Sequence, residues 1–332
     1  MTKRRLVLIA VFAVPLFLSL FVRAPAGYLG SEIAGELERI SDTRPNLVCI
    51  GNSLVEAAVD AHALEKLTGA RSLVIQRGGA SSACWYLIMK NVVCASPHRP
   101  RYAAVFFVDS AVTLPTFRVE GRDRTNRIDP FSLAEEPILH KLAYPDEKWR
   151  LAFYLEQIWP LFRYRDHFKA RLLDMLQDAP LYTLGIPAIE DRTAEKAFTM
   201  VFPDKLMDPA LLTRLQLVEE DEETLPPRPY DFEYWTGRSF LPQYIGLARQ
   251  NRIQLILVRM KRRRDALEVP SPPGLEQYRR DLQAYLALER IPFLDFTGDP
   301  RIKLKHFSAG DHLQNEDLFT RILAASLKRF LK

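Results

Sequence analysis

The chain has few of the residues that hold metals or disulfide bonds. Its 332 residues include only three cysteines and six histidines. The cysteines, at positions 49, 84 and 94, show neither Cys-x-x-Cys spacing nor a Cys/His metal pattern. We therefore expect no disulfide framework and no metal site. Internal repeats and low-complexity tracts are also lacking, which argues against a repeat architecture.

A strong excess of one charge is lacking as well. The 46 basic and 41 acidic residues leave a net charge of +5, with a pI near 9.0. This excess is small and spread along the chain, so it supports an anionic partner only weakly and gives no specific sign of nucleic-acid binding. The apolar share of 48% supplies a core, and the length suits one large α/β domain or two modest ones.

One long apolar run is present, near the N-terminus. Residues 6–22 carry no charge and follow the basic residues Lys3, Arg4 and Arg5. Such a run is at the short end of a membrane span, and its basic flank places the N-terminus in the cytoplasm. We expect residues 1–27 to form a single-pass anchor in the inner (cytoplasmic) membrane, with residues 28–332 on the periplasmic, extracytoplasmic side. A cleaved signal peptide is the alternative, because residues 24–26 resemble a cleavage site.

Short apolar runs alternate with helical patterns over much of the remaining chain. The predicted strands are residues 46–50, 72–76, 103–108, 253–260 and 292–296. The third run, AAVFFV, is apolar on both faces, as in a central parallel strand. Strands that alternate with helices predict a flavodoxin-like three-layer α/β/α sandwich with a parallel sheet.

Residues 115–238 depart from this alternation. Residues 118–127 are polar and rich in arginine, which predicts a loop. Residues 146–177 form a long helical stretch with many aromatic side chains, interrupted by Pro160. Residues 218–227 are acidic and end in a proline pair, as expected of a solvated loop. We interpret residues 115–238 as a helical, aromatic-rich insertion in the sheet domain.

A candidate nucleophile follows the first strand. Gly51, Asn52 and Ser53 form a turn that can lift a serine hydroxyl above the end of a sheet. Open α/β sheets bind ligands at the carboxyl ends of their strands, which favours a functional role for Ser53. Capping of the following helix is the alternative role of this serine.

The ends of the next strands carry further candidates. Gly79 follows the second strand, where its N–H is placed to act as an oxyanion donor, unless it only forms a turn. Asp109 follows the third strand and Arg259 ends the fourth. Together with Asn52 they are the candidate substrate-binding residues. Helix capping or a loop turn is the alternative for Asp109.

Basic and histidine-bearing loops follow the last two strands. Residues 261–264 read Lys-Arg-Arg-Arg and could grip an anionic or sugar substrate, although we favour a solvated basic loop for 262–264. Asp311 and His312 precede the predicted closing helix. His312 can lean over the same sheet edge as a general base, with His306 as its rival and a plain surface histidine as the alternative.

This order of motifs resembles the SGNH (GDSL-type) hydrolase superfamily. The nucleophile turn of that family corresponds to residues 51–54, its glycine N–H donor to Gly79, and its histidine before the closing helix to His312. The resemblance covers residues 45–110 and 239–332. It implies Ser53 as the nucleophile and His312 as the base, with Asp311 to orient the histidine. The N–H groups of Ser53 and Gly79 would hold the oxyanion, and no cofactor would be needed.

Two positions depart from the family pattern. Asp109 stands where an asparagine donor is expected, and Ala309 stands three residues before His312, where the orienting aspartate is expected. Loss of an orienting acid weakens a serine protease triad by about 10⁴. The candidates to replace it are Asp311, Asp295 and Asp299.

The N-terminal run adds to the resemblance. Together they resemble the membrane-anchored, extracytoplasmic branch that works beside membrane-bound O-acyltransferases on cell-envelope polysaccharides. The sequence therefore predicts a serine acyl hydrolase or O-acyltransferase acting on an envelope glycan or other ester, with a membrane-bound O-acyltransferase as the candidate partner. The alternative is a catalytically degenerate domain that serves as an interaction subunit of a membrane complex.

Overall fold

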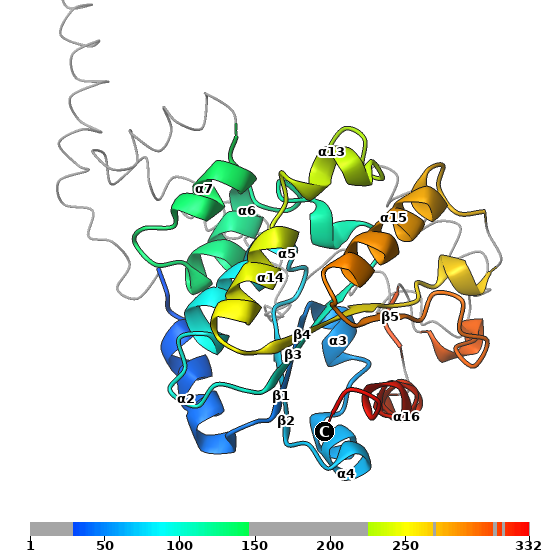
Figure 1. Cartoon of the computed structure of the whole chain (residues 1–332), viewed down its shortest axis with the longest axis horizontal. Coiled ribbons are helices and arrows are strands. Elements are labelled where there is room, and N and C mark those ends of the chain that lie inside the picture. Colours follow the sequence, from blue (N-terminus) through cyan, green and yellow to red (C-terminus); the bar gives the residue numbers. More distant parts are fainter. Residues whose placement is uncertain (1–28, 146–224, 268–269, 308–310, 314–315, 332) are drawn as a thin grey trace, which may run out of the picture.

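A computed structural model describes residues 29–145 and 225–331, apart from 268–269, 308–310 and 314–315. Five parallel strands form one sheet in the order β2-β1-β3-β4-β5 (Figure 1). The strands are β1 (Leu47–Gly51), β2 (Ser72–Gln76), β3 (Tyr102–Phe107), β4 (Gln254–Arg259) and β5 (Phe293–Asp295). The predicted parallel α/β sheet is confirmed.

Alternate side chains of the central strands enter two separate cores. Along β1, Val48 and Ile50 pack into one core, whereas Leu47 and Cys49 pack into the other. β3 is buried along its whole length, so both of its faces are covered. Apolar runs such as AAVFFV are therefore explained by burial on two faces of a parallel sheet.

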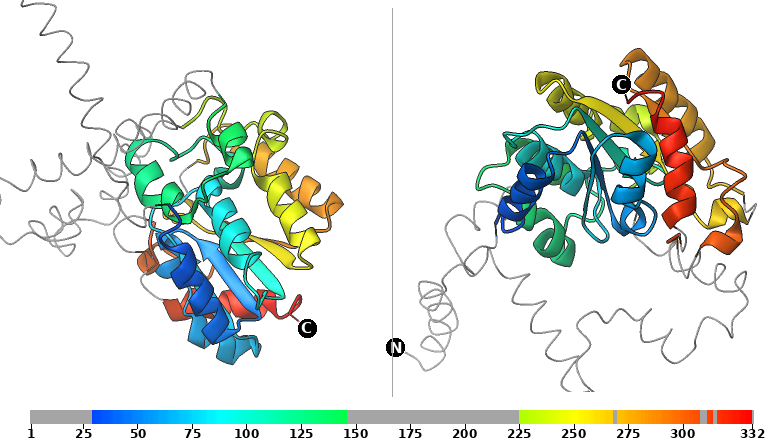
Figure 2. Two further views of the ribbon diagram at one scale, coloured as in Figure 1. Left: turned by 90° about the vertical axis from the view of Figure 1, so that its left-hand side faces the viewer. Right: turned by 90° about the horizontal axis from the view of Figure 1, so that it is seen from below.

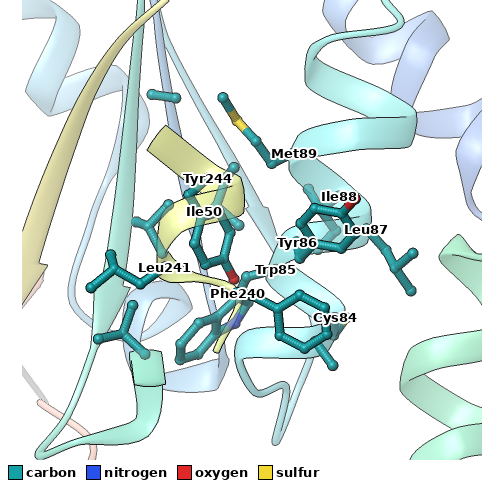
Figure 3. Close-up of a cluster of buried hydrophobic side chains, with 14 of the residues drawn as sticks. Ile50, Cys84, Trp85, Tyr86, Leu87, Ile88, Met89, Phe240, Leu241 and Tyr244 are labelled. Atoms are coloured by element: carbon teal, nitrogen blue, oxygen red, sulfur yellow. The ribbon is translucent and has the colours of Figure 1, made fainter. Parts of the chain in front are cut away.

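The larger core lies between the sheet and a layer of helices. That layer contains α2 (Ile33–Thr43), α5 (Ser82–Leu87), the π-helical segment η1 (Ile88–Val93), α14 (Leu241–Gln250) and α15 (Leu275–Leu288). Figure 3 shows Trp85 and Tyr86 of α5 beside Phe240, the N-cap of α14, and Tyr244 within α14. The rings of Tyr86 and Phe240 are stacked, with 5.0 Å between their centroids. Large buried rings of this kind dominate the apolar area that folding removes from water.

The second core lies on the opposite face of the sheet. It is formed by α3 (Ser53–Glu56), α4 (Ala61–Thr68) and α16 (Glu316–Leu327), and α16 lies beside α4 (Figure 2). Thr320 of α16 ties the two parts of the chain together, because its hydroxyl accepts from the N–H of Asp60 at 3.0 Å and lies 3.3 Å from the Ala58 carbonyl oxygen. The C-terminal helix is thus fixed next to the segment that follows β1.

The strand order creates a switch point between β1 and β3. From β1 the chain crosses to β2 on one side, and later strands are added on the other side of β1. Loops after β1 and β3 leave the carboxyl edge in opposite directions at such a point, which is where open α/β sheets bind their ligands. Ser53 follows β1 and Asp109 follows β3, so both lie at this position.

The described ends of the predicted insertion pack against the sheet domain. They contain η2 (Ala111–Thr113), α6 (Gly121–Asp123), η3 (Arg124–Ile128), η4 (Asp129–Phe131), α7 (Pro137–Ala143) and α13 (Phe232–Thr236). Residues 118–127 were predicted to be a loop. That prediction was wrong in part, since α6 and η3 are short helical turns. Directly after this range, Ile128 and Phe131 enter the larger core.

Two sequence predictions fall wholly outside the described residues, and the acidic loop predicted at 218–227 is described only from residue 225. The first two are the N-terminal anchor at 1–27 and the aromatic helical stretch at 146–177. Within the part of the chain that is described, no helix has the length and apolar character needed to cross a membrane.

Candidate functional site

The turn after β1 presents the hydroxyl of Ser53. A Cβ atom on Gly51 would lie 2.3 Å from Cγ2 of Val55, so only glycine lets α3 fold back this closely onto the strand. Asn52 is the N-cap of α3, and its Oδ1 accepts from the N–H of Leu54 at 3.0 Å. Capping is therefore performed by Asn52 and not by Ser53. The carbonyl oxygen of the Asn52 side chain is used within the protein, and the predicted role of Asn52 in substrate binding stays a prediction.

The loop between β5 and α16 brings His312 to this hydroxyl. Nε2 of His312 lies 3.0 Å from Oγ of Ser53, within hydrogen-bond distance. An antiparallel bridge between Phe307 and Leu313 closes the base of the loop, and both of these side chains are buried in the second core. Ser53 and His312 are partly exposed. The structure thus brings together the two residues that the sequence singled out.

Asp311 does not orient the histidine ring. Its Oδ2 accepts from Nε of Arg262 at 2.7 Å, and its Oδ1 accepts from the backbone N–H of Arg263 at 2.8 Å. Both carboxylate oxygens are directed at the basic loop that follows β4. The predicted role of Asp311 as the orienting acid is therefore corrected, because its carboxylate pairs with a guanidinium and not with the imidazole.

The rival histidine and the other candidate acids lie in separate local contacts. Nδ1 of His306 accepts from the N–H of Lys303 at 3.0 Å, within the turn η7 (Leu304–His306). Asp299 binds Arg301, with Oδ2 accepting from Nη2 at 2.6 Å. Asp295 accepts from the hydroxyl of Thr297 at 2.7 Å. Ala309, at the position expected for the family aspartate, lies outside the described residues.

Gly79 adopts the left-handed conformation that the turn after β2 requires, with φ of +67°. Its N–H has no acceptor among the residues that the structure describes, nor does the N–H of Ser53. Nε of Arg127, from η3, donates to the Gly78 carbonyl oxygen at 2.6 Å, and the Arg127 guanidinium occupies the space where a Gly79 side chain would lie. The two N–H groups predicted to hold an oxyanion are thus available as donors.

Asp109 follows β3 in a different environment. It has φ of +49° and is buried. Nη1 of Arg262 donates to its Oδ2 at 2.7 Å, and Nη2 of Arg264 donates to its Oδ1. Burial disfavours the charged carboxylate and raises its pKa, but Arg262 and Arg264 outweigh this effect, so the pKa of Asp109 lies below its usual value. Asp109 therefore binds the basic loop, and its predicted role in substrate binding stays a prediction.

Arg259 is also an internal residue. Its side chain is 2% exposed, and its Nη1 lies 3.5 Å from Oδ2 of Asp295. A guanidinium enclosed in this way is part of the protein interior, and its predicted role in substrate binding stays a prediction. Its burial follows from its place at the end of β4, where it stands in register with Phe107 of β3 and its backbone carbonyl oxygen accepts from the N–H of Phe296.

The described residues also include cysteines and other potential metal ligands. Cys49, Cys84 and Cys94 are free and buried. Burial raises the pKa of the Cys49 and Cys84 thiols to about 12, so neither is a thiolate at neutral pH. No group of three or more His, Cys, Asp and Glu residues that could hold a metal ion occurs among the described residues.

The sequence interpretation missed the arginines around this site. Residues 262–264 were expected to be a solvated loop, but Arg263 and Arg264 are buried and the Arg262 side chain is only 14% exposed. Acidic side chains at the same sheet edge, Asp109 and Asp311, were the available signal for internal ion pairs. The contact of Arg127 with the glycine turn had no comparable signal in the sequence.

Comparison with known proteins adds no relative. The chain matches no family model, no curated protein and no solved structure.

Proposed function

We propose that this protein is a membrane-anchored, extracytoplasmic serine acyl hydrolase or O-acyltransferase of the SGNH type. The observation that carries the proposal is the 3.0 Å contact between Oγ of Ser53 and Nε2 of His312. The two residues are far apart in the sequence, yet they meet at the switch point of the sheet, where ligands of open α/β folds bind. The alternative is that this contact only stabilises the fold. The partial exposure of both side chains favours a role in which His312 activates Ser53.

The geometry supports an acyl-transfer cycle. Oγ of Ser53 attacks the acyl carbonyl carbon while Nε2 of His312 accepts the hydroxyl proton. The resulting oxyanion accepts hydrogen bonds from the N–H groups of Ser53 and Gly79. As the tetrahedral intermediate collapses, His312 donates its proton to the leaving alkoxide and an acyl-serine remains. Water or an acceptor hydroxyl then attacks the acyl-serine by the same steps in reverse order, which restores Ser53.

The cellular setting of the proposal depends on the sequence. The apolar run at 6–22 and the basic residues before it support a single-pass anchor in the inner membrane with the sheet domain outside. The resemblance to the SGNH branch that serves membrane-bound O-acyltransferases supports an envelope glycan ester as the substrate. A membrane-bound O-acyltransferase is then the proposed partner.

One observation favours a second candidate function. A carboxylate, Asp109, occupies the position where the family has an amide donor, and it is held by two arginines. A site without this donor loses part of its oxyanion stabilisation, and loss of one such donor costs about 10²–10³ in kcat. The second candidate is therefore a catalytically degenerate subunit that binds within a membrane complex.

Labelling with a fluorophosphonate probe separates these two functions. Such a probe reacts with a serine only when a base activates its hydroxyl. We expect wild-type protein to be labelled and to hydrolyse an aryl acetate, and we expect Ser53→Ala to lose both signals by at least about 10³-fold.

Ser72→Ala is the matched control. Ser72 begins β2 at the opposite, amino end of the sheet, where its hydroxyl donates to the Ala70 carbonyl oxygen at 2.8 Å. This variant should be labelled like the wild type. Absence of labelling in folded wild-type protein, or equal labelling of Ser53→Ala, would contradict the enzyme and support the binding subunit.

A further inference from the structure

The basic loop after β4 connects the two acidic residues of the site. Arg262 donates through Nε to Oδ2 of Asp311 and through Nη1 to Oδ2 of Asp109, at 2.7 Å in each case. The N–H of Arg263 donates to the other oxygen of Asp311. One guanidinium thus ties the loop that carries His312 to the turn that follows β3, across more than 150 residues of sequence between Asp109 and the basic loop.

These contacts are well suited to hold a loop in place. The side chains of Arg262, Asp109 and Asp311 are 14%, 12% and 15% exposed, so water competes little for their hydrogen bonds. Asp109 is fixed in turn by Arg264 and by its own left-handed backbone. A planar guanidinium with two directed hydrogen bonds restrains both distance and orientation, which an ammonium group does not.

The restraint acts directly next to the imidazole. Asp311 precedes His312, so their Cα atoms are about 3.8 Å apart. On the other side, Leu313 is fixed by its bridge to Phe307. Residue 312 is therefore held from both neighbours, one by a polar anchor and one by an apolar anchor. The contact with Ser53 is a hydrogen bond whose length depends on this loop position.

We infer that Arg262 is a positioning residue, which holds Asp311 and thereby keeps His312 within hydrogen-bond reach of Ser53. This inference rests on the proposed function. In this role Asp311 differs from a triad acid. Its carboxylate fixes the backbone of the loop that carries His312 and does not bind the imidazole ring. Asp109 likewise has a role, as the buried support of Arg262.

The competing explanation is that Arg262 only neutralises Asp109. In that case its loss lowers the stability of the fold, and the reactivity of Ser53 in folded protein is unchanged. The test must therefore measure reactivity at a temperature at which every variant is folded. It must also separate kcat from KM, because a misplaced base slows the chemical step without weakening the binding of a small ester.

The experiment compares Arg262→Gln, Asp311→Asn and the double variant. The readouts are the rate of fluorophosphonate labelling and the values of kcat and KM for an aryl acetate, with the folded fraction followed by circular dichroism. We expect each single variant to lose about 10- to 100-fold in kcat, as for a misplacement near 1 Å, with KM within about twofold. The double variant should be no slower than the slower single variant, because both changes break the same link.

Two further variants sharpen the result. Arg262→Lys keeps the charge and one contact, so it should recover part of the rate. Arg249→Gln is the matched control, since Nη2 of Arg249 makes a comparable 2.7 Å ion pair with Glu289 at the surface. It should label at the wild-type rate. Asp311→Asn alone tests the inference if Arg262→Gln does not fold, because it leaves the Arg262–Asp109 pair intact.

The outcomes distinguish this inference from the function on which it rests. Ser53-dependent labelling of the wild type, together with wild-type rates in folded Arg262→Gln and Asp311→Asn, would overturn the positioning role and leave the enzyme. Losses that multiply in the double variant would also overturn it. Absence of Ser53-dependent labelling in the wild type would overturn the enzyme and the positioning role together.

Discussion

The turns after β1 and β3 leave neighbouring strands at the same edge of the sheet, yet they have become different kinds of site. Ser53 is partly exposed, and its hydroxyl meets the imidazole of His312. Asp109 is buried, and its carboxylate meets two guanidinium groups. Location at a switch point is shared by both turns. What separates them is the side chain that each turn presents and the loop that lies over it.

The difference has an energetic cause. A hydroxyl is neutral, so it can remain at a half-exposed position with a single partner at small cost. A buried carboxylate loses its hydration and is stable only when cations replace the water. Asp109 therefore requires Arg262 and Arg264, whereas Ser53 stays partly exposed beside His312. The first turn thus carries a neutral, partly exposed side chain, and the second a buried ion pair.

Replacement of His312 by alanine should have the largest effect on this comparison. Without the imidazole the Ser53 hydroxyl has no base in the described site, so labelling and turnover should fall by about 10³-fold or more. The stability of the fold should change by less than about 1 kcal/mol, because His312 is a partly exposed loop residue. Rates of fluorophosphonate labelling and a urea unfolding curve measure the two effects.

His306→Ala is the control for that variant. His306 lies in the same connection between β5 and α16, but its ring binds the Lys303 N–H within a local turn. Labelling should be unchanged. A large loss in His306→Ala, or a wild-type rate in His312→Ala, would show that His312 is not the base. The distinction between the two turns would then no longer hold.

Asp109→Asn should affect stability more than any surface change. Asparagine tolerates the left-handed backbone at this position, so the variant removes charge with little change of shape. Two arginines would lose their shared anion, and the free energy of unfolding should fall by about 3 kcal/mol at pH 7. Glu289→Gln, which breaks the exposed pair with Arg249, should cost less than about 1 kcal/mol.

The same variant predicts a pH dependence. Because the folded-state pKa of Asp109 is lowered, its ionised form stabilises the fold fully above the ordinary carboxyl pKa of about 4, and this contribution is lost as the pH falls through the lowered value. The difference in unfolding free energy between wild type and Asp109→Asn should therefore shrink in acid. A difference that stays constant with pH would show that charge is not the cause.

Gly79→Ala should give the smallest change in the labelling rate among these variants. An alanine at φ of +67° costs about 1–2 kcal/mol, and its Cβ would displace the Arg127 guanidinium from the glycine turn. Gly69→Ala is the matched variant, because Gly69 has φ of +75° at the end of α4 with open space around it. Gly79→Ala should lose more stability than Gly69→Ala, because it also disturbs the Arg127 contact, and only Gly79→Ala should slow labelling. Equal labelling rates would show that the conformation of this turn and its contact with Arg127 do not affect the reaction of Ser53.

Much of the fold was predictable from local pattern. Burial on two faces makes the runs in β1, β3 and β4 almost wholly apolar, and that signal survives without any tertiary information. Ser53 and His312 were found because a polar turn at a strand end and a histidine before the closing helix lie at fixed places in such a topology. Their roles in catalysis stay predictions.

The charged residues were harder to interpret, for a physical reason. An arginine in a sequence looks the same whether water or a carboxylate solvates it. Arg259 was therefore predicted to bind a substrate and the run at 262–264 to be solvated, although Arg259 pairs with Asp295 and Arg264 with Asp109. Asp311 was predicted to orient the neighbouring His312 ring. Its actual partner, Arg262, comes from another loop, and the sequence does not show that the two loops meet.

The bond between Thr320 and the chain near Asp60 has a consequence for how the protein matures. It fixes α16 beside the segment that follows Ser53, and α16 begins four positions after His312. A growing polypeptide therefore displays its hydroxyl long before its imidazole has been synthesised. The contact between Ser53 and His312 can form only once the last helix has docked, so a nascent or truncated copy lacks it.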